Sequence, residues 1–154
     1  MNRGIAFEIP NEYGSFLGDI LKPFDTKDFN WQLGREEAYI ILEGEIGNNL
    51  FAEDISTIEG TVLKNLLVNN TYYIIFADLQ AYPKGHTISK METYEEFTQS
   101  ECELVLLVAD SCYSTLYCKN KGKLELLFNH AHDCGFIDVQ YITDENDTRT
   151  RLSV

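Results

Sequence analysis

The sequence predicts an α+β fold, a mixed or mainly antiparallel sheet with about four helices packed on it, in a single domain spanning residues 1–154. Segments in which apolar and polar residues alternate, as in strands, are interspersed with segments of helical periodicity. They do not follow the regular strand–helix–strand order of a parallel sheet. Two hairpins are expected among the strands, and no repeat, low-complexity tract or linker divides the chain. The chain length also lies near the common size of one domain.

The N-terminal segment predicts one strand followed by one helix. Residues 3–9 alternate in the manner of a half-buried strand. Pro10 ends this strand, and Asn11 is expected to cap the next helix by accepting a hydrogen bond from a free backbone N–H. Pro23 ends that helix, whose apolar side chains follow at helical spacing and are Phe16, Leu17, Ile20 and Leu21.

The middle of the chain predicts a hairpin, an irregular stretch, a helix and the strongest strand. Residues 29–33 and 38–42 are expected to pair with each other around the Gly-containing turn between them. Residues 44–60 are rich in Gly and Asn, which favour turns, and residues 62–68 predict a short helix. Residues 71–80 are β-branched or aromatic almost throughout, so we expect this strand to be central in the sheet.

A second hairpin is predicted in the C-terminal half. Residues 102–109 and 112–118 predict two strands that are joined at Asp110 and Ser111. One interpretation of this turn is a two-residue hairpin. Its register puts apolar side chains of the first strand on the same face as three side chains of the second: Leu104, Leu106 and Val108 with Tyr113, Thr115 and Tyr117.

Two further helices and a last strand are predicted. Thr93 and Glu96 form a capping-box pattern that opens a helix over 94–99. A helix over 121–133 carries an apolar stripe with i, i+3, i+4 and i+7 spacing, formed by Leu124, Leu127, Phe128 and Ala131. A strand over 137–142 and a polar tail follow.

The charge of the chain restricts its partners. The chain has 25 Asp and Glu residues and 12 Lys and Arg residues, which give a formal net charge of −13. DNA and anionic membrane surfaces repel such a protein, because binding either one requires Lys and Arg to replace counterions. We therefore expect no nucleic-acid partner and no membrane partner. The charge fits plain solubility, and it also fits a basic protein partner or mimicry of a nucleic-acid surface.

The sequence indicates a cytoplasmic protein. Its N-terminal residues lack the apolar core of a signal peptide. No apolar run approaches the length of about 20 residues that spans a bilayer. The four cysteines are therefore expected to be reduced.

No cofactor and no metal site are expected. His130 and His132 are two positions apart on a predicted helix, so their side chains point about 200° apart. His130 and Cys134 share a flank of the helix, but two ligands are fewer than a zinc site needs. No local motif supports a cysteine nucleophile, although a cysteine paired with a distant histidine is left open.

The sequence contains no recognised catalytic or phosphate-binding motif. The acidic segment 144–147 faintly resembles a calcium loop, but it lacks the central Gly and the closing Glu of an EF-hand. Its charges are expected to pair with Arg149 and Arg151. The glycines at 44 and 47 are not followed by the Lys of a phosphate loop, and no serine lies in a nucleophile elbow. No catalytic residue is therefore assigned.

One constellation is a candidate ligand cleft. Asp78 lies inside the most apolar predicted strand, where a carboxylate must be paired or must face a cleft. Tyr82 and His86 follow it along the chain. We expect perturbed ionisation at Asp78, Tyr82 and His86 if they form a site.

Several stretches of the chain together resemble a known family. They are RGIAFEIPNEYGSFL at 3–17, TYYIIFADLQAYPKG at 71–85, CELVLLVADS at 102–111 and YITDENDTRTRLSV at 141–154. The chain resembles, from end to end, a family of small uncharacterised proteins from Bacillus-type bacteria that is catalogued as a domain of unknown function. The resemblance implies a bacterial, cytoplasmic origin and carries over no activity, substrate or site residue.

Two hypotheses about function follow. The favoured hypothesis is an acidic protein-binding module, such as an inhibitor or an immunity-type factor, because acidic surfaces speed association with basic partners. The alternative is an enzyme or a small-ligand binder with a motif-free site near Asp78, Tyr82 and His86. A deep cavity lined by Asp78, Tyr82, His86 or the cysteines favours the alternative, and a surface without a cavity near about 300 Å³ argues against it. The sequence does not specify the oligomeric state.

Overall fold

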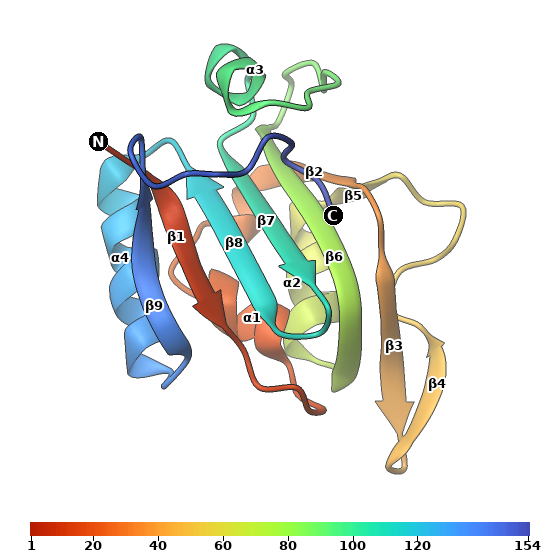
Figure 1. Ribbon diagram of the computed structural model, residues 1–154. Coiled ribbons are helices and arrows are strands. Elements are labelled where there is room, and N and C mark those ends of the chain that lie inside the picture. Colours follow the sequence, from red (N-terminus) through yellow and green to blue (C-terminus); the bar gives the residue numbers. More distant parts are fainter.

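The computed structural model describes residues 1–154 as a nine-stranded antiparallel sheet with four α-helices (Figure 1). The main strand order is β4-β3-β6-β7-β8-β1-β9, and β2 pairs with β5 and β6. The strands are β1 (Asn2–Glu8), β2 (Phe29–Leu33), β3 (Glu37–Leu42), β4 (Glu45–Asn49), β5 (Thr57–Glu59), β6 (Tyr72–Pro83), β7 (Leu104–Ala109), β8 (Tyr113–Cys118) and β9 (Ile137–Thr143). The helices are α1 (Phe16–Leu21), α2 (Gly60–Val68), α3 (Tyr94–Gln99) and α4 (Lys121–Asp133). The predicted antiparallel sheet with helices is confirmed, and the sheet is its larger part.

Helices α1, α2 and α4 cover one face of the sheet, and the larger hydrophobic core lies between them and the strands (Figure 1). Trp31 of β2 is fully buried there, and its Nε1–H donates to the carbonyl of Thr26 at 3.0 Å. Phe128 of α4 is partly buried and stacks on Tyr141 of β9, with 4.1 Å between ring centroids. The other residues of the predicted stripe on α4 are all buried in this core: Leu124, Leu127 and Ala131. None of the helices combines the length and the apolar composition needed to cross a membrane.

The opposite face of the sheet carries a smaller core. We call residues 148–154 the C-terminal strap, because this segment crosses the sheet from the end of β9 towards β6 (Figure 1). Leu152 anchors the strap, since its residue is 2% exposed and its N–H donates to the carbonyl of Glu92 at 2.8 Å. The smaller core includes Tyr82, Phe97, Val105, Leu107, Tyr117, Ile142 and Leu152.

Strand β6 is 12 residues long, and two strands share one of its sides. Strand β2 pairs with the half that ends at Pro83, and β3 pairs with the half that begins at Tyr72. Both run in the same direction along β6, so the expected hairpin between residues 29–33 and 38–42 is wrong. The chain bulges at 34–36 instead of reversing. Gly34 permits this close approach, because a Cβ there would lie 2.6 Å from the carboxyl carbon of Asp78.

The turn between β7 and β8 contains one residue more than a two-residue hairpin. Ala109 pairs with Tyr113, which leaves Asp110, Ser111 and Cys112 in the turn. The N–H of Ser111 donates to the carbonyl of Ile75 on β6 at 3.1 Å and ties the longer turn to the sheet. A shift of one residue moves every side chain to the other face, so the expected face sharing is wrong. The observed neighbours are Leu104, Leu106 and Val108 with Cys118, Leu116 and Ser114.

Two other local expectations need correction. Ser15, not Asn11, occupies the N-cap position of α1. The side chain of Asn11 instead accepts a hydrogen bond from the hydroxyl of Tyr73 at 2.6 Å. The stretch 44–60, expected to be irregular, contains β4 and β5, because pairing with β3 and β2 stabilises strands that their polar sequence does not predict. The capping box of α3 is confirmed, since Thr93 Oγ1 accepts the N–H of Glu96 at 3.1 Å.

Truncation of Phe128 is expected to cost more stability than truncation of His132. Replacing a fully buried Phe by Ala lowers the free energy of unfolding by about 3–5 kcal/mol. Phe128 is partly exposed, so we expect a smaller decrease, of about 2 kcal/mol. His132→Ala on the exposed side of α4 should stay within about 0.5 kcal/mol of the parent. Urea unfolding followed by the fluorescence of Trp31 measures both losses. A larger loss for His132→Ala would contradict the assigned helix face.

Candidate functional site

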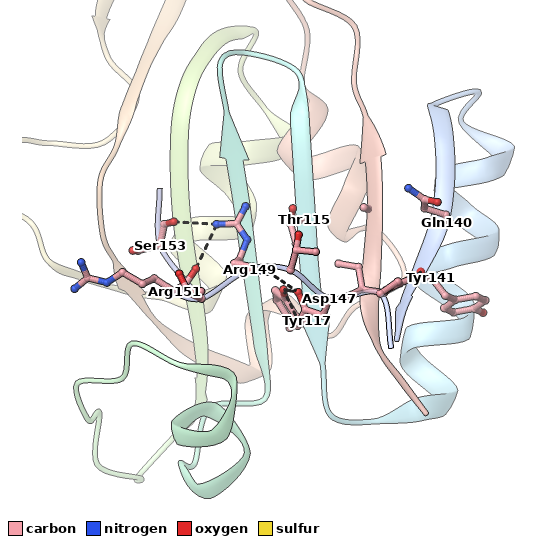
Figure 2. Close-up of a pocket in the computed structure, with 13 residues that line it drawn as sticks. Thr115, Tyr117, Gln140, Tyr141, Asp147, Arg149, Arg151 and Ser153 are labelled. Atoms are coloured by element: carbon pink, nitrogen blue, oxygen red, sulfur yellow. Dashed lines mark hydrogen bonds between the residues drawn. The ribbon is translucent and has the colours of Figure 1, made fainter. Parts of the chain in front are cut away.

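A cavity of about 650 Å³ opens on the sheet face opposite α1, α2 and α4, between the strap and strands β8, β1 and β9 (Figure 2). We call it the C-terminal trough. Ala6 of β1 pairs with Thr115 of β8 on one side and with Gln140 of β9 on the other, and these three residues line the trough. Because Ala6 carries only a methyl group, the sheet surface is hollow at this point.

Asp147 fixes the chain where the strap leaves β9. Its side chain is 4% exposed and accepts a hydrogen bond from Arg3 Nη1 at 3.2 Å. The hydroxyl of Tyr117 donates to Asp147 at 3.1 Å, and the backbone N–H of Arg149 donates to it at 3.1 Å. Arg3 Nε also pairs with Asp144 at 2.9 Å. The start of the strap is therefore held on the sheet by charge-assisted hydrogen bonds.

The acidic segment 144–147 forms no ion pair with Arg149 or Arg151, so this expected pairing is wrong. Arg3 lies beside the segment because β1 and β9 are neighbours in the sheet. Arg151 pairs with Glu92 at 3.2 Å instead. Strand pairing, rather than closeness along the chain, determines which charges meet here.

Arg149 is the charged residue of the trough that has no ionic partner. Its Nη1 donates to the backbone carbonyls of Arg151 at 3.4 Å and Ser153 at 3.0 Å, as the dashed lines in Figure 2 show. No carboxylate lies within ion-pair distance of its guanidinium, although the chain has 25 acidic residues. Its Nε and Nη2 donate no hydrogen bond to the protein. A guanidinium binds a carboxylate or phosphate through two parallel hydrogen bonds, and this edge of Arg149 is available for such a group.

Buried Asp78 and half-buried Glu36 form a pair of carboxyl groups at the bulge between β2 and β3. Glu36 Oε1 accepts a hydrogen bond from the backbone N–H of Asp78 at 3.0 Å. In a regular antiparallel pair, a backbone carbonyl of the neighbouring strand accepts this hydrogen bond. Asp78 is 4% exposed. One oxygen of each group, Asp78 Oδ1 and Glu36 Oε2, is buried without a hydrogen-bond partner. An unpaired buried polar atom costs about 1–3 kcal/mol, so this pair does not favour stability.

Burial shifts the ionisation of both carboxyl groups. Burial raises the pKa of Asp78 to about 6, while the N–H of Val154 and the charge of Arg149 oppose that rise. Burial raises the pKa of Glu36 to about 9, and the negative charge of Asp78 adds to the rise while the N–H of Asp78 opposes it. At neutral pH Glu36 is therefore protonated and Asp78 is mostly ionised. Carboxyl groups whose pKa values are pushed apart are typical of functional sites.

The structure does not bring the three sequence-predicted site residues into one hydrogen-bond network. Asp78 and Tyr82 lie on the same face of β6, roughly 13 Å apart along the strand. The hydroxyl of Tyr82 donates to the carbonyl of Ser89 at 2.8 Å, and burial raises the pKa of Tyr82 to about 12. His86 lies beyond the end of β6 and pairs with Glu101 at 3.1 Å. A shared ligand cleft of these three residues stays a prediction.

Sequence reasoning selected Asp78 but missed Glu36, which accepts the backbone N–H of Asp78, and Arg149, whose charge opposes the rise in the pKa of Asp78. Glu36 has the sequence context of a turn residue, and only the bulge brings it to Asp78. Arg149 lies far along the chain in a polar tail, and only the path of the strap brings it near. The signal that was available is the position of an acid inside an apolar strand.

The histidines and cysteines do not converge on one site. His130 Nε2 lies 2.7 Å from the carbonyl of Asp19 and 3.5 Å from Cys134 Sγ. No group of three or more His, Cys, Asp or Glu side chains is arranged to hold a metal ion. All four cysteines are free. Burial raises the pKa of Cys102 to about 12 and that of Cys118 to about 11, so both thiols are protonated and pack as small hydrophobic groups.

Glu36→Gln is expected to stabilise the fold at alkaline pH. The pKa of Glu36 is raised by folding from 4.5 to about 9, so the stability that its neutral form provides is complete below 4.5 and is lost as the pH rises through 9. Glutamine keeps an oxygen for the N–H of Asp78 and never ionises. We expect variant and parent to have similar free energies of unfolding at pH ~5. At pH ~9 we expect the free energy of unfolding of the variant to exceed that of the parent by at least ~1 kcal/mol.

Urea unfolding at the two pH values, followed by Trp31 fluorescence, measures this gain. Glu125→Gln is the matched control, because it removes the same charge from an exposed position on α4. An equal gain for Glu125→Gln would show that overall charge, rather than burial of Glu36, causes the effect.

Comparison with known proteins identifies the relatives of the chain. A family model described as "Protein of unknown function (DUF2691)" matches residues 2–153. The chain is 49% identical to "Uncharacterized protein YncE" of Bacillus subtilis (strain 168) over 154 residues, which is 100% of each protein. No solved structure matches the chain. These matches confirm the resemblance to small uncharacterised Bacillus-type proteins, and the chain belongs to the DUF2691 family.

Proposed function

We propose that the protein binds a small polar molecule with an anionic group in the C-terminal trough. The observation that carries this proposal is Arg149, whose guanidinium lines the trough with no carboxylate partner and with Nε and Nη2 free. A carboxylate, sulfate or phosphate group of a ligand completes the hydrogen bonds of that edge.

The size and lining of the trough support a small polar ligand. Its volume of about 650 Å³ lies within the range of roughly 300–1,000 Å³ that is typical of small-molecule sites. Hydroxyl and amide groups line much of it, contributed by Thr115, Gln140, Asn146, Thr148, Thr150 and Ser153. These groups donate and accept hydrogen bonds, so the lining favours a ligand with several polar groups over an apolar one.

The local charges support an anion in spite of the net charge of −13. Asp147 is neutralised by Arg3 at 3.2 Å, and Arg151 is neutralised by Glu92 at 3.2 Å. Arg149 is left as the charged residue of the trough without an ion-pair partner. Salt screens the remaining surface charges beyond about 8–10 Å. Arg149 therefore attracts a small anion in the trough more strongly than the distant acidic residues repel it. An extended polyanion also contacts the acidic surface and is repelled by it.

Binding, rather than catalysis, is the function that this lining supports. The trough lining includes neither His, Cys nor Lys, which are common general bases and nucleophiles. Its one carboxylate, Asp147, is engaged by Arg3 and by the hydroxyl of Tyr117. The lining therefore favours a binding site over a catalytic one.

Association with a basic protein is a second candidate function. The net charge of −13 favours it, and so does the β3–β4 hairpin, which projects from the body of the molecule (Figure 1). Strand β4 forms one edge of the sheet, and the hairpin exposes Leu42 and Ile46, which are 60% and 56% exposed. An open strand edge can pair with another chain. Capture of basic proteins that weakens steeply with salt would support this candidate.

Replacement of Arg149 is expected to remove anion binding. The parent protein is titrated with inorganic sulfate, inorganic phosphate and a small dicarboxylate, and NMR shifts report the affinity. Arg149→Gln should weaken the best of these affinities by at least about tenfold, because charge-assisted hydrogen bonds contribute about 1.5–3 kcal/mol. Arg149→Lys keeps the charge but loses the planar fork, so its affinity should be intermediate.

Lys27→Gln is the control for this experiment. It removes one positive charge from an exposed residue beside α2, on the other side of the sheet. Its anion affinity should equal that of the parent. Equal losses for Lys27→Gln and Arg149→Gln would show non-specific attraction and would overturn the proposed site.

A further inference from the structure

Asp78 lies in the same row of cross-strand neighbours as Ala6 and Thr115, two residues that line the trough. The sheet register pairs Ala6 with Thr115, Thr115 with Leu107, and Leu107 with Asp78. Side chains of directly paired residues point to the same face of a sheet. The side chain of Asp78 therefore lies on the face of the sheet that carries the trough, roughly 10 Å from Thr115 at normal strand spacing. The strap crosses this face towards β6 (Figure 1).

Arg149 is shared between the trough and Asp78. It lines the trough, and its positive charge also acts on the Asp78 carboxylate. Asp78 Oδ1 has no hydrogen-bond partner. The N–H of Val154 and, after it, the charge of Arg149 are the influences that favour the ionised form of Asp78. An anion bound at Arg149 offsets that positive charge and adds a negative charge nearby, so ionised Asp78 becomes less favourable.

We infer that an anion bound at Arg149 draws a proton onto Asp78, so that ligand binding and proton uptake are linked. This inference rests on the proposed anion site and describes how that site is regulated. Linkage of binding free energies is reciprocal, so protonation of Asp78 strengthens anion binding by the same factor. The trough therefore takes up its ligand more tightly at mildly acidic pH and releases it at alkaline pH.

The surroundings of Asp78 leave it as the group that titrates in this range. Burial raises the pKa of Asp78 to about 6, whereas burial raises the pKa of Glu36, which faces it from the bulge, to about 9. Glu36 therefore stays neutral from mildly acidic to mildly alkaline pH. Arg149 on the strap supplies the positive charge that acts on Asp78. Leu107, the neighbour of Asp78 on β7, has no charge. One proton, on Asp78, carries the linkage.

Sulfate titrations at pH ~5.5 and pH ~8, on either side of the Asp78 transition, test the inference, because the charge of sulfate does not change over this range. The parent should bind sulfate about tenfold more tightly at the lower pH, which corresponds to a rise of about one unit in the pKa of Asp78 on binding. Asp78→Asn has a neutral group of the same shape and should show the low-pH affinity at both pH values. Glu36→Gln removes the adjacent carboxyl, which is neutral in this range, and should keep the pH dependence of the parent.

The outcomes separate this inference from the proposed function. A pH dependence that persists unchanged in Asp78→Asn would overturn the linkage and leave the anion site standing. Absence of sulfate binding by the parent at both pH values would overturn the anion site itself. If Asp78→Asn does not fold, calorimetry of the parent in buffers of different ionisation enthalpy counts the protons taken up on binding. Proton uptake near neutral pH supports the linkage, and its absence contradicts it.

Discussion

The length of β6 governs the arrangement of the sheet around it. Its 12 residues pair with β7 on one side, and on the other side they need two shorter strands in succession. Strands β2 and β3 therefore follow one another with a bulge between them, and the bulge places Glu36 against the backbone N–H of Asp78. The carboxyl pair is thus a consequence of how a long strand is covered, not of a local motif.

The face opposite α1, α2 and α4 is only partly covered, and this creates the trough. Leu152 seals the smaller core, and Asp147 fixes the start of the strap through Arg3 and Tyr117. Between these two attachments the strap passes over the sheet without filling the hollow above Ala6. The same segment brings Arg149 to this hollow. One stretch of chain therefore both covers part of the sheet and supplies the proposed anion-binding group.

Local sequence patterns predicted the elements more accurately than their pairing. The apolar stripe located α4, the capping box located α3, and the β-branched run located β6, because each signal depends on neighbouring residues alone. The expected pairing of β2 with β3 was wrong because β6 competes for both strands. The expected register of β7 and β8 was wrong because Cys112 joins Asp110 and Ser111 in the turn. The N–H of Ser111 in this longer turn donates to the carbonyl of Ile75, a contact between distant segments that local patterns do not indicate.

The trough was beyond sequence reasoning because Ala6, Thr115 and Arg149 are ordinary residues in their own segments and meet only in the folded sheet. Asp78 differs, because an acid within an apolar strand contradicts its local environment. Residues that conflict with their local environment are expected at functional sites, where interactions elsewhere in the fold offset the stability they lose. An apolar residue at this position avoids the unpaired buried oxygen, but it cannot exchange a proton when the charge near Arg149 changes. On the proposed linkage, the stability lost by burying Asp78 is the physical requirement for a site that responds to pH.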